Sequence, residues 1–158
     1  MSGKVSAHVF DVQVTPTIGT SQYADGDQLG ALFTIDTGIA DDNKNLTLMS
    51  VTVIDQDDES AALDILLFDE SPTIASSDNA ALNVGDDEMV DKYIGHVSIA
   101  ADDYVDLAAN AAATKTNVNL NCRAVINGEL YGIIRCGGTP TYAATDDLTL
   151  RFTFLADL

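Results

Sequence analysis

The chain has 158 residues, 46% of them apolar, and its 25 acidic residues against 7 basic ones give a formal net charge of −18 at pH 7. This length fits one domain with a substantial core, and the apolar content excludes a disordered chain. So negative a protein repels nucleic-acid phosphates and anionic membranes, and no run approaches the ~18 apolar residues of a membrane helix. We therefore expect a soluble protein that binds neither nucleic acid nor membrane. Met1-Ser2-Gly3-Lys4 leads into strand-like sequence without an apolar signal region.

Alternation of apolar and polar residues predicts strands along the whole chain. The first, over residues 5–14, changes its apolar phase between Val9 and Phe10, as a β-bulge would require. The other seven span residues 29–35, 46–54, 63–68, 94–99, 118–126, 130–136 and 148–154. About eight strands without long helices between them predict an all-β fold, an antiparallel β-sandwich or jelly-roll-like domain over residues 1–158. Its expected core contains Phe33, Val53, Leu67, Ile133, Phe152 and Phe154.

One short helix is expected between the fourth and fifth strands. Gly85-Asp86-Asp87-Glu88 supplies an N-cap and negative charge at a helix start, and Met89, Val90 and Tyr93 are expected to share one face. The alanine-rich residues 107–113 fit either another helical turn or a loop packed on the body.

No catalytic motif is present in the sequence. Neither His8 nor His96 has the sequence partners of a catalytic triad, and both lie within predicted strands. The chain also lacks a Gly-Xaa-Ser-Xaa-Gly elbow, a phosphate-binding glycine loop and a His-Glu-Xaa-Xaa-His motif. We therefore expect no catalytic residues and no enzyme activity.

The acidic stretch 55–59 is the main candidate metal site, and residues 25–27 and 102–103 are similar but shorter. Asp55, Asp57 and Glu59 place carboxylates at alternate positions, where they could converge on a hard cation. The stretch lacks the sixth-position glycine and the distal glutamate of an EF-hand loop. A solvated loop is the alternative to a weak Ca²⁺ or Mg²⁺ site, and no other cofactor is expected.

Cys122 and Cys136 are too few for a disulfide-built scaffold. A three-residue hairpin loop centred on Glu129 would place them opposite each other, whereas a two-residue Asn127-Gly128 turn would not. Two buried free thiols are favoured over a disulfide, which requires specific geometry.

Several segments together resemble a family of small proteins encoded by tailed bacteriophages and prophages. They are residues 14–18 (VTPTI), 23–30 (YADGDQLG), 50–55 (SVTVID), 61–68 (AALDILLF), 131–133 (YGI), 138–142 (GTPTY) and 147–152 (DLTLRF). The resemblance covers most of the chain and implies a virion component, but none of these segments is a catalytic signature. The acidity would suit a virus from a salty habitat, where ions screen self-repulsion.

The resulting hypothesis is a capsid decoration (cement) protein on the outer surface of a tailed-phage head. Its partners would be the major capsid protein and further copies of itself, as a homotrimer, within a virion assembled in the host cytoplasm. A tail, neck or fibre-associated virion protein is the first alternative. The second is a carbohydrate-binding β-sandwich module with Tyr104, Tyr131 or Tyr142 as a stacking platform, although the chain has no Trp. Residues 1–4 and the strand after them are a candidate binding edge.

Overall fold

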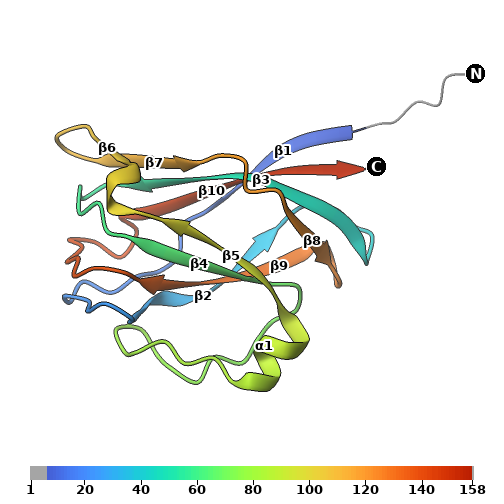
Figure 1. The fold of residues 1–158 in the computed structure, drawn as a ribbon, viewed down its shortest axis with the longest axis horizontal. Coiled ribbons are helices and arrows are strands. Elements are labelled where there is room, and N and C mark those ends of the chain that lie inside the picture. The colour runs from blue at the N-terminus through green and yellow to red at the C-terminus, as the bar shows by residue number, and fades with distance from the viewer. Residues whose placement is uncertain (1–6, 158) are drawn as a thin grey trace, which may run out of the picture.

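In the computed structural model, which describes residues 7–157, two antiparallel β-sheets pack face to face as a β-sandwich (Figure 1). The described residues form ten strands, one α-helix and one 3₁₀ turn. In chain order these are β1 (Ala7–Val14), β2 (Gln28–Asp36), β3 (Lys44–Asp55), β4 (Leu63–Phe68), α1 (Asp86–Lys92), β5 (Tyr93–Ile99), η1 (Ala101–Asp103), β6 (Tyr104–Asp106), β7 (Ala111–Lys115), β8 (Leu120–Ala124), β9 (Glu129–Cys136) and β10 (Leu148–Asp157).

The long strand β3 organises the larger sheet. The six-stranded sheet has the order β1-β10-β3-β7-β6, and β8 pairs with the first part of β3 while β7 pairs with its second part. The four-stranded sheet has the order β2-β9-β4-β5. Figure 1 shows the six-stranded sheet above the four-stranded one, with α1 and the segment before it beneath.

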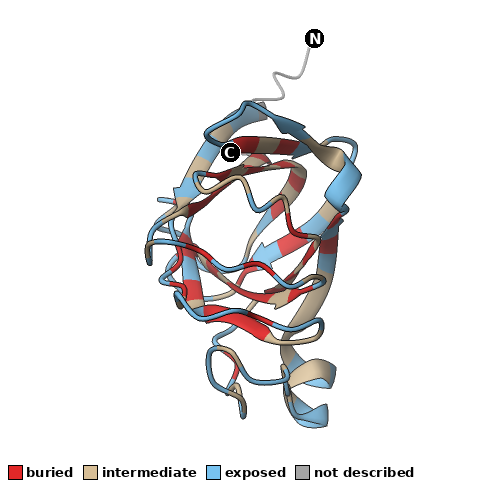
Figure 2. Ribbon diagram, turned by 90° about the vertical axis from the view of Figure 1, so that its left-hand side faces the viewer, coloured by how far each residue is buried: buried red, intermediate tan, exposed pale blue. Residues whose placement is uncertain are grey.

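The core fills the space between the two sheets, as the period-two pattern predicts. All six residues expected in the core are buried, and Phe33, the least buried of them, is 7% exposed. Five of them belong to the core cluster between the sheets, whereas Ile133 is buried outside that cluster. Rings from opposite sheets meet there, with the centroids of Phe33 and Phe152 6.2 Å apart. Figure 2 shows buried residues lining the interior and exposed residues over the loops and α1.

The eight predicted strands correspond to β1–β5 and β8–β10, and the structure adds β6 and β7. For residues 107–113 the loop expected from the sequence is present at 107–110, but the expectation was wrong for 111–113, because Ala111–Lys115 is a strand paired with β3. Ala111 and Ala113 are buried there, opposite Asp55 and Val53. Small side chains that pack against β3 in this way outweigh the helical preference of alanine.

The bulge predicted in the first strand is absent from its described part. β1 pairs with β10 without a register shift from Ala7 to Val14, and residues 5 and 6 lie outside the described residues. Val9 is 64% exposed on the outer surface, while Phe10 packs against the core. The change in apolar phase therefore marks an exposed valine. A register shift does occur between β10 and β3, at Thr153 and Phe154.

The helix prediction was confirmed, except for one residue on its face. Gly85 is the N-cap of α1, and Lys92 Nζ lies 2.7 Å from Glu88 Oε2. Val90, however, is 83% exposed, so it does not share a packed face with Met89 and Tyr93, which are half-buried.

The predicted hairpin between the two cysteines was wrong. β8 pairs with β3, so Cys122 lies opposite Leu46, whereas β9 pairs with β4, so Cys136 lies opposite Leu63. The connection between β8 and β9 therefore crosses from one sheet to the other, because each strand packs its apolar side chains into the core from a different layer. Both cysteines are buried and free, as favoured from the sequence.

The segment between β4 and α1 is tied to the edge of β2. Asp78 Oδ1 accepts hydrogen bonds from Tyr23 Oη at 2.6 Å and from the Gly30 amide at 2.7 Å. The backbone N–H of Gln28 also donates to the Ala80 carbonyl at 2.7 Å. These bonds hold the segment against the four-stranded sheet and cover the start of the β2 edge.

Candidate functional site: an acid-poor face

The outer surface of the six-stranded sheet is the candidate docking surface. Alternation along each strand sends every second side chain outward, and the strand registers align these side chains in rows. One row contains Val9, Leu155, Thr47 and Asn121, and another contains Gln13, Arg151, Thr52 and Thr114. We call this surface the acid-poor face. Its residues are Val9, Asp11, Gln13, Asn45, Thr47, Ser50, Thr52, Ile54, Val105, Ala112, Thr114, Asn121, Arg123, Thr149, Arg151, Thr153 and Leu155.

Charge is distributed unevenly between this face and the rest of the protein. Among the residues of the acid-poor face, Asp11 is the only acid and Arg123 and Arg151 are the bases. The protein as a whole carries −18. Its acids are concentrated in loops such as 55–59 and in the segment 69–91, beneath the other sheet in Figure 1. A nearly neutral face thus lies opposite a strongly negative one.

Hydroxyl groups bond across the strands of the acid-poor face. Thr52 Oγ1 and Thr114 Oγ1 are 3.1 Å apart, and Thr153 Oγ1 donates to Asp11 Oδ1 at 2.7 Å. Several short side chains of the face therefore already have partners. Such side chains lose little conformational freedom when another surface covers them, which favours docking.

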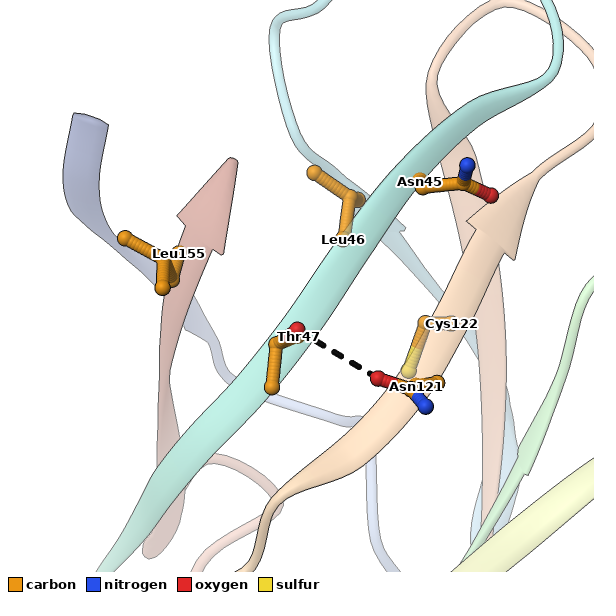
Figure 3. Close-up of a pocket in the computed structure, with 6 residues that line it drawn as sticks. All are labelled: Asn45, Leu46, Thr47, Asn121, Cys122 and Leu155. Carbon is orange, nitrogen blue, oxygen red and sulfur yellow. Dashed lines mark hydrogen bonds between the residues drawn. The ribbon is translucent and has the colours of Figure 1, made fainter. Parts of the chain in front are cut away.

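A hollow of about 430 Å³ opens at one end of this face (Figure 3). β10 contributes Leu155, β3 contributes Asn45, Leu46 and Thr47, and β8 contributes Asn121 and Cys122. Thr47 Oγ1 donates to Asn121 Oδ1 across the hollow at 3.5 Å. Burial raises the pKa of the Cys122 thiol to about 12, so the thiol is neutral at pH 7. With no charged side chain in its lining, the hollow suits an uncharged protrusion of a partner surface.

The three carboxylates of the candidate metal loop bind backbone amides. The Asp55 carboxylate accepts from Asp57 N at 3.0 Å and from Ser60 N at 2.9 Å. Asp57 Oδ2 accepts from Ala143 N at 2.9 Å, and Glu59 Oε2 accepts from Thr141 N at 3.0 Å. The loop is thereby fastened to the connection between β9 and β10. In the described part of the chain, these three carboxylates do not converge as a group of three metal ligands, and no other His, Cys, Asp or Glu side chains do so. Cation binding at Asp55, Asp57 and Glu59 stays a prediction.

The two histidines lie on different sheets, in β1 and β5, and both are exposed. His8 stacks on Phe10 with ring centroids 5.6 Å apart. His96 Nδ1 is 2.7 Å from Tyr93 Oη. The structure therefore does not bring the two histidines together in one site.

The stacking platforms proposed for sugars differ in exposure. Tyr142 is 1% exposed, so it is a core residue and cannot serve as a platform. It follows the Gly137–Pro140 turn and belongs to the core cluster, where its ring meets Tyr23 edge-on. Tyr104 is half-buried, and Tyr131 donates its hydroxyl to Glu129 Oε2 at 2.7 Å.

Sequence reasoning missed the acid-poor face, although the signal was present. The polar positions of the predicted strands are mostly Thr, Asn, Gln and Arg, while the acids fall between the strands. Recognising a face required the strand order, since β1, β10, β3 and β8 are neighbours only in space. No helix among residues 7–157 is long and apolar enough to cross a membrane.

Comparison with known proteins gave matches among solved structures alone: no family model and no curated protein matches the chain. Among the solved structures that resemble it are those of several viruses. A chain of Desmodium yellow mottle tymovirus has 14% sequence identity and a TM-score of 0.36, with 99% of this chain and 84% of that chain covered. The match to tomato aspermy virus has 12% identity and a TM-score of 0.44, covering 100% and 82%. Turnip yellow mosaic virus matches with 11% identity and a TM-score of 0.35, covering 99% and 83%. At these identities and TM-scores, function has to be argued from the surface of the protein itself.

Proposed function

We propose that this protein is a non-catalytic virion component that decorates the outer surface of a tailed-phage head. The major capsid protein is its partner, and the acid-poor face is the surface that contacts the shell. The resemblance of its sequence segments to small proteins of tailed phages motivates the choice of virus. A homotrimer, expected from the sequence, stays a prediction that the occupancy of decorated particles tests.

The observation that carries this proposal is the uneven distribution of charge. Two acidic surfaces repel each other when they approach, and like charges brought together in an interface cost several kcal/mol. A protein with a net charge of −18 can approach a shell most easily through the face that holds one acid and two arginines. The acid-rich loops and the segment 69–91 would then face the solvent, where water and ions stabilise them.

Binding to purified heads of the encoding phage that lack this protein tests the proposal. Thr114→Asp introduces one negative charge at an exposed position of the acid-poor face. Val90→Asp introduces the same charge on α1, at a side chain that is 83% exposed. Both variants carry the same net charge and substitute exposed residues, so they form a matched pair.

We expect the Thr114→Asp variant to bind heads about tenfold or more weakly, equivalent to about 1.4 kcal/mol. The Val90→Asp variant should bind like the unsubstituted protein. Equal binding by both variants would place the docking surface elsewhere. If the unsubstituted protein fails to bind heads, the decoration role is wrong.

A further inference from the structure

Strand β1 has an open edge. It pairs with β10 on one side, and among residues 7–157 no main-chain hydrogen bond reaches its other side. Alternate residues along an unpaired edge direct their N–H and C=O groups outward, and such an edge is a template for another strand.

The remaining edges are covered or short. The edge of β2 bonds to residues 79 and 80 at its start, and the Ala31 amide donates to Thr17 O at 3.2 Å. The side chain of Leu120 in β8 lies against Gly95 of β5, so close that a methyl group on Gly95 would come within 2.8 Å of Leu120 Cδ1. β6 has three residues, and β8 has five with Arg123 among them. β1 has eight residues and is the longest open edge.

We propose that the β1 edges of two copies of this chain pair antiparallel about a twofold axis, which joins their six-stranded sheets into one continuous sheet. The inference does not depend on the proposed function. Because each copy carries −18, the copies can meet only where acids are scarce. β1 meets this condition, since Asp11 is its single charged residue and it borders the acid-poor face.

The sequence of β1 is compatible with itself in this arrangement. In antiparallel pairing, opposed residues lie on the same face, so a twofold axis passes through a residue position. An axis at Asp11 would oppose two carboxylates, which is unfavourable. An axis at Phe10 places Asp11 opposite Val9 of the second copy. The two Phe10 rings then extend the stack with Phe154, whose centroid is 5.7 Å from that of Phe10. This geometry favours a dimer in place of the trimer expected from the sequence.

Analytical ultracentrifugation of the isolated full chain tests the proposal with a set of four proteins. The unsubstituted protein should form a dimer, and so should Val9→Thr, which keeps a strand-forming side chain without charge. Val9→Asp should raise the dimer dissociation constant about tenfold or more, because the new carboxylate faces Asp11 of the other copy. Val90→Asp, with the same net charge, should dimerise like the unsubstituted protein. Circular dichroism checks that each variant is folded.

Hydrogen exchange provides a second measurement that needs no substitution. Alternate amides of β1 should become protected as the protein concentration rises through the dimer range. The proposal is overturned if the protein stays monomeric at about millimolar concentration. It also fails if Val9→Asp and Val90→Asp dimerise equally, or if the β1 amides of the dimer exchange as fast as those of the monomer. Because no particle is present, these results are independent of head binding.

Discussion

Gly132 in β9 is expected to tolerate no side chain, because the ring of Phe33 occupies the space above it. The two residues are opposed in the β2–β9 pair. A methyl group on Gly132 would overlap Cε2 and Cζ of Phe33 and lie 3.2 Å from Cε1. The Phe33 ring also packs on Phe152 from the other sheet, with centroids 6.2 Å apart, so it has little room to move. Overpacking of this kind costs about 1–3 kcal/mol.

Guanidinium unfolding followed by circular dichroism measures the effect. Gly132→Ala should lower the free energy of unfolding by about 1–3 kcal/mol, which corresponds to about 2–4 °C in Tm for each kcal/mol. Adding Phe33→Leu should relieve part of this loss, so the two substitutions should be non-additive. Gly138→Ala is the control, since the nearest atom to its new methyl group would be Ala61 Cβ at 3.8 Å. A Gly132→Ala variant within about 0.5 kcal/mol of the parent would refute the packing of Phe33 on Gly132.

Three further predictions concern pH, thiols and histidines. Burial raises the pKa of Asp55 in the folded state, so its contribution to stability is full below the unfolded pKa and falls as pH rises through the folded one. The contribution of Asp55 to the free energy of unfolding should therefore decrease as pH rises from the ordinary pKa of an Asp carboxyl. Asp55→Asn should remove this part of the pH dependence, and a pH dependence unchanged in Asp55→Asn would contradict the assignment. Because burial also raises the pKa of Cys122 and Cys136, both thiols should react with a thiol reagent only after unfolding, and fast labelling of the folded protein would count against this packing. Replacing His96 of β5 by Gln should leave self-association and head binding intact. An enzymatic turnover lost on replacing either His8 or His96 would overturn the non-catalytic role.

The sequence predicted the layers of this fold better than their connections. Alternation in residues 148–154 identified β10 because its inward side chains, such as Phe152, are large and apolar. The same rule missed β7, where alanines face both inward and outward and the apolar contrast disappears. It also misplaced β8 and β9, since alternation indicates which side of a strand is buried and leaves its partner strand undetermined. For this reason the symmetry of the two cysteines about Glu129 suggested a hairpin that the sheet order excludes.

The surroundings of the candidate sites could not be predicted for the same reason, since the residues that form them come from segments far apart in sequence. The acidic stretch 55–59 was predicted as a candidate cation site, which stays a prediction. Its hydrogen bonds to Thr141 and Ala143 join segments far apart in sequence, so no local pattern could indicate them. Tyr142 was expected at the surface after a turn, yet its aromatic surface is buried beside Tyr23. The acid-poor face depends on strands from both ends of the chain, so no local pattern could reveal it.

A density map of the purified particle from the encoding phage tests the central claim most directly. We predict a β-sandwich on the outer surface of the head, with the six-stranded sheet toward the shell and α1 toward the solvent. Density for the sandwich at the tail or neck would instead support the tail-associated alternative. A sandwich bound to the head through its four-stranded sheet, or missing from the particle altogether, would contradict the docking face or the virion role.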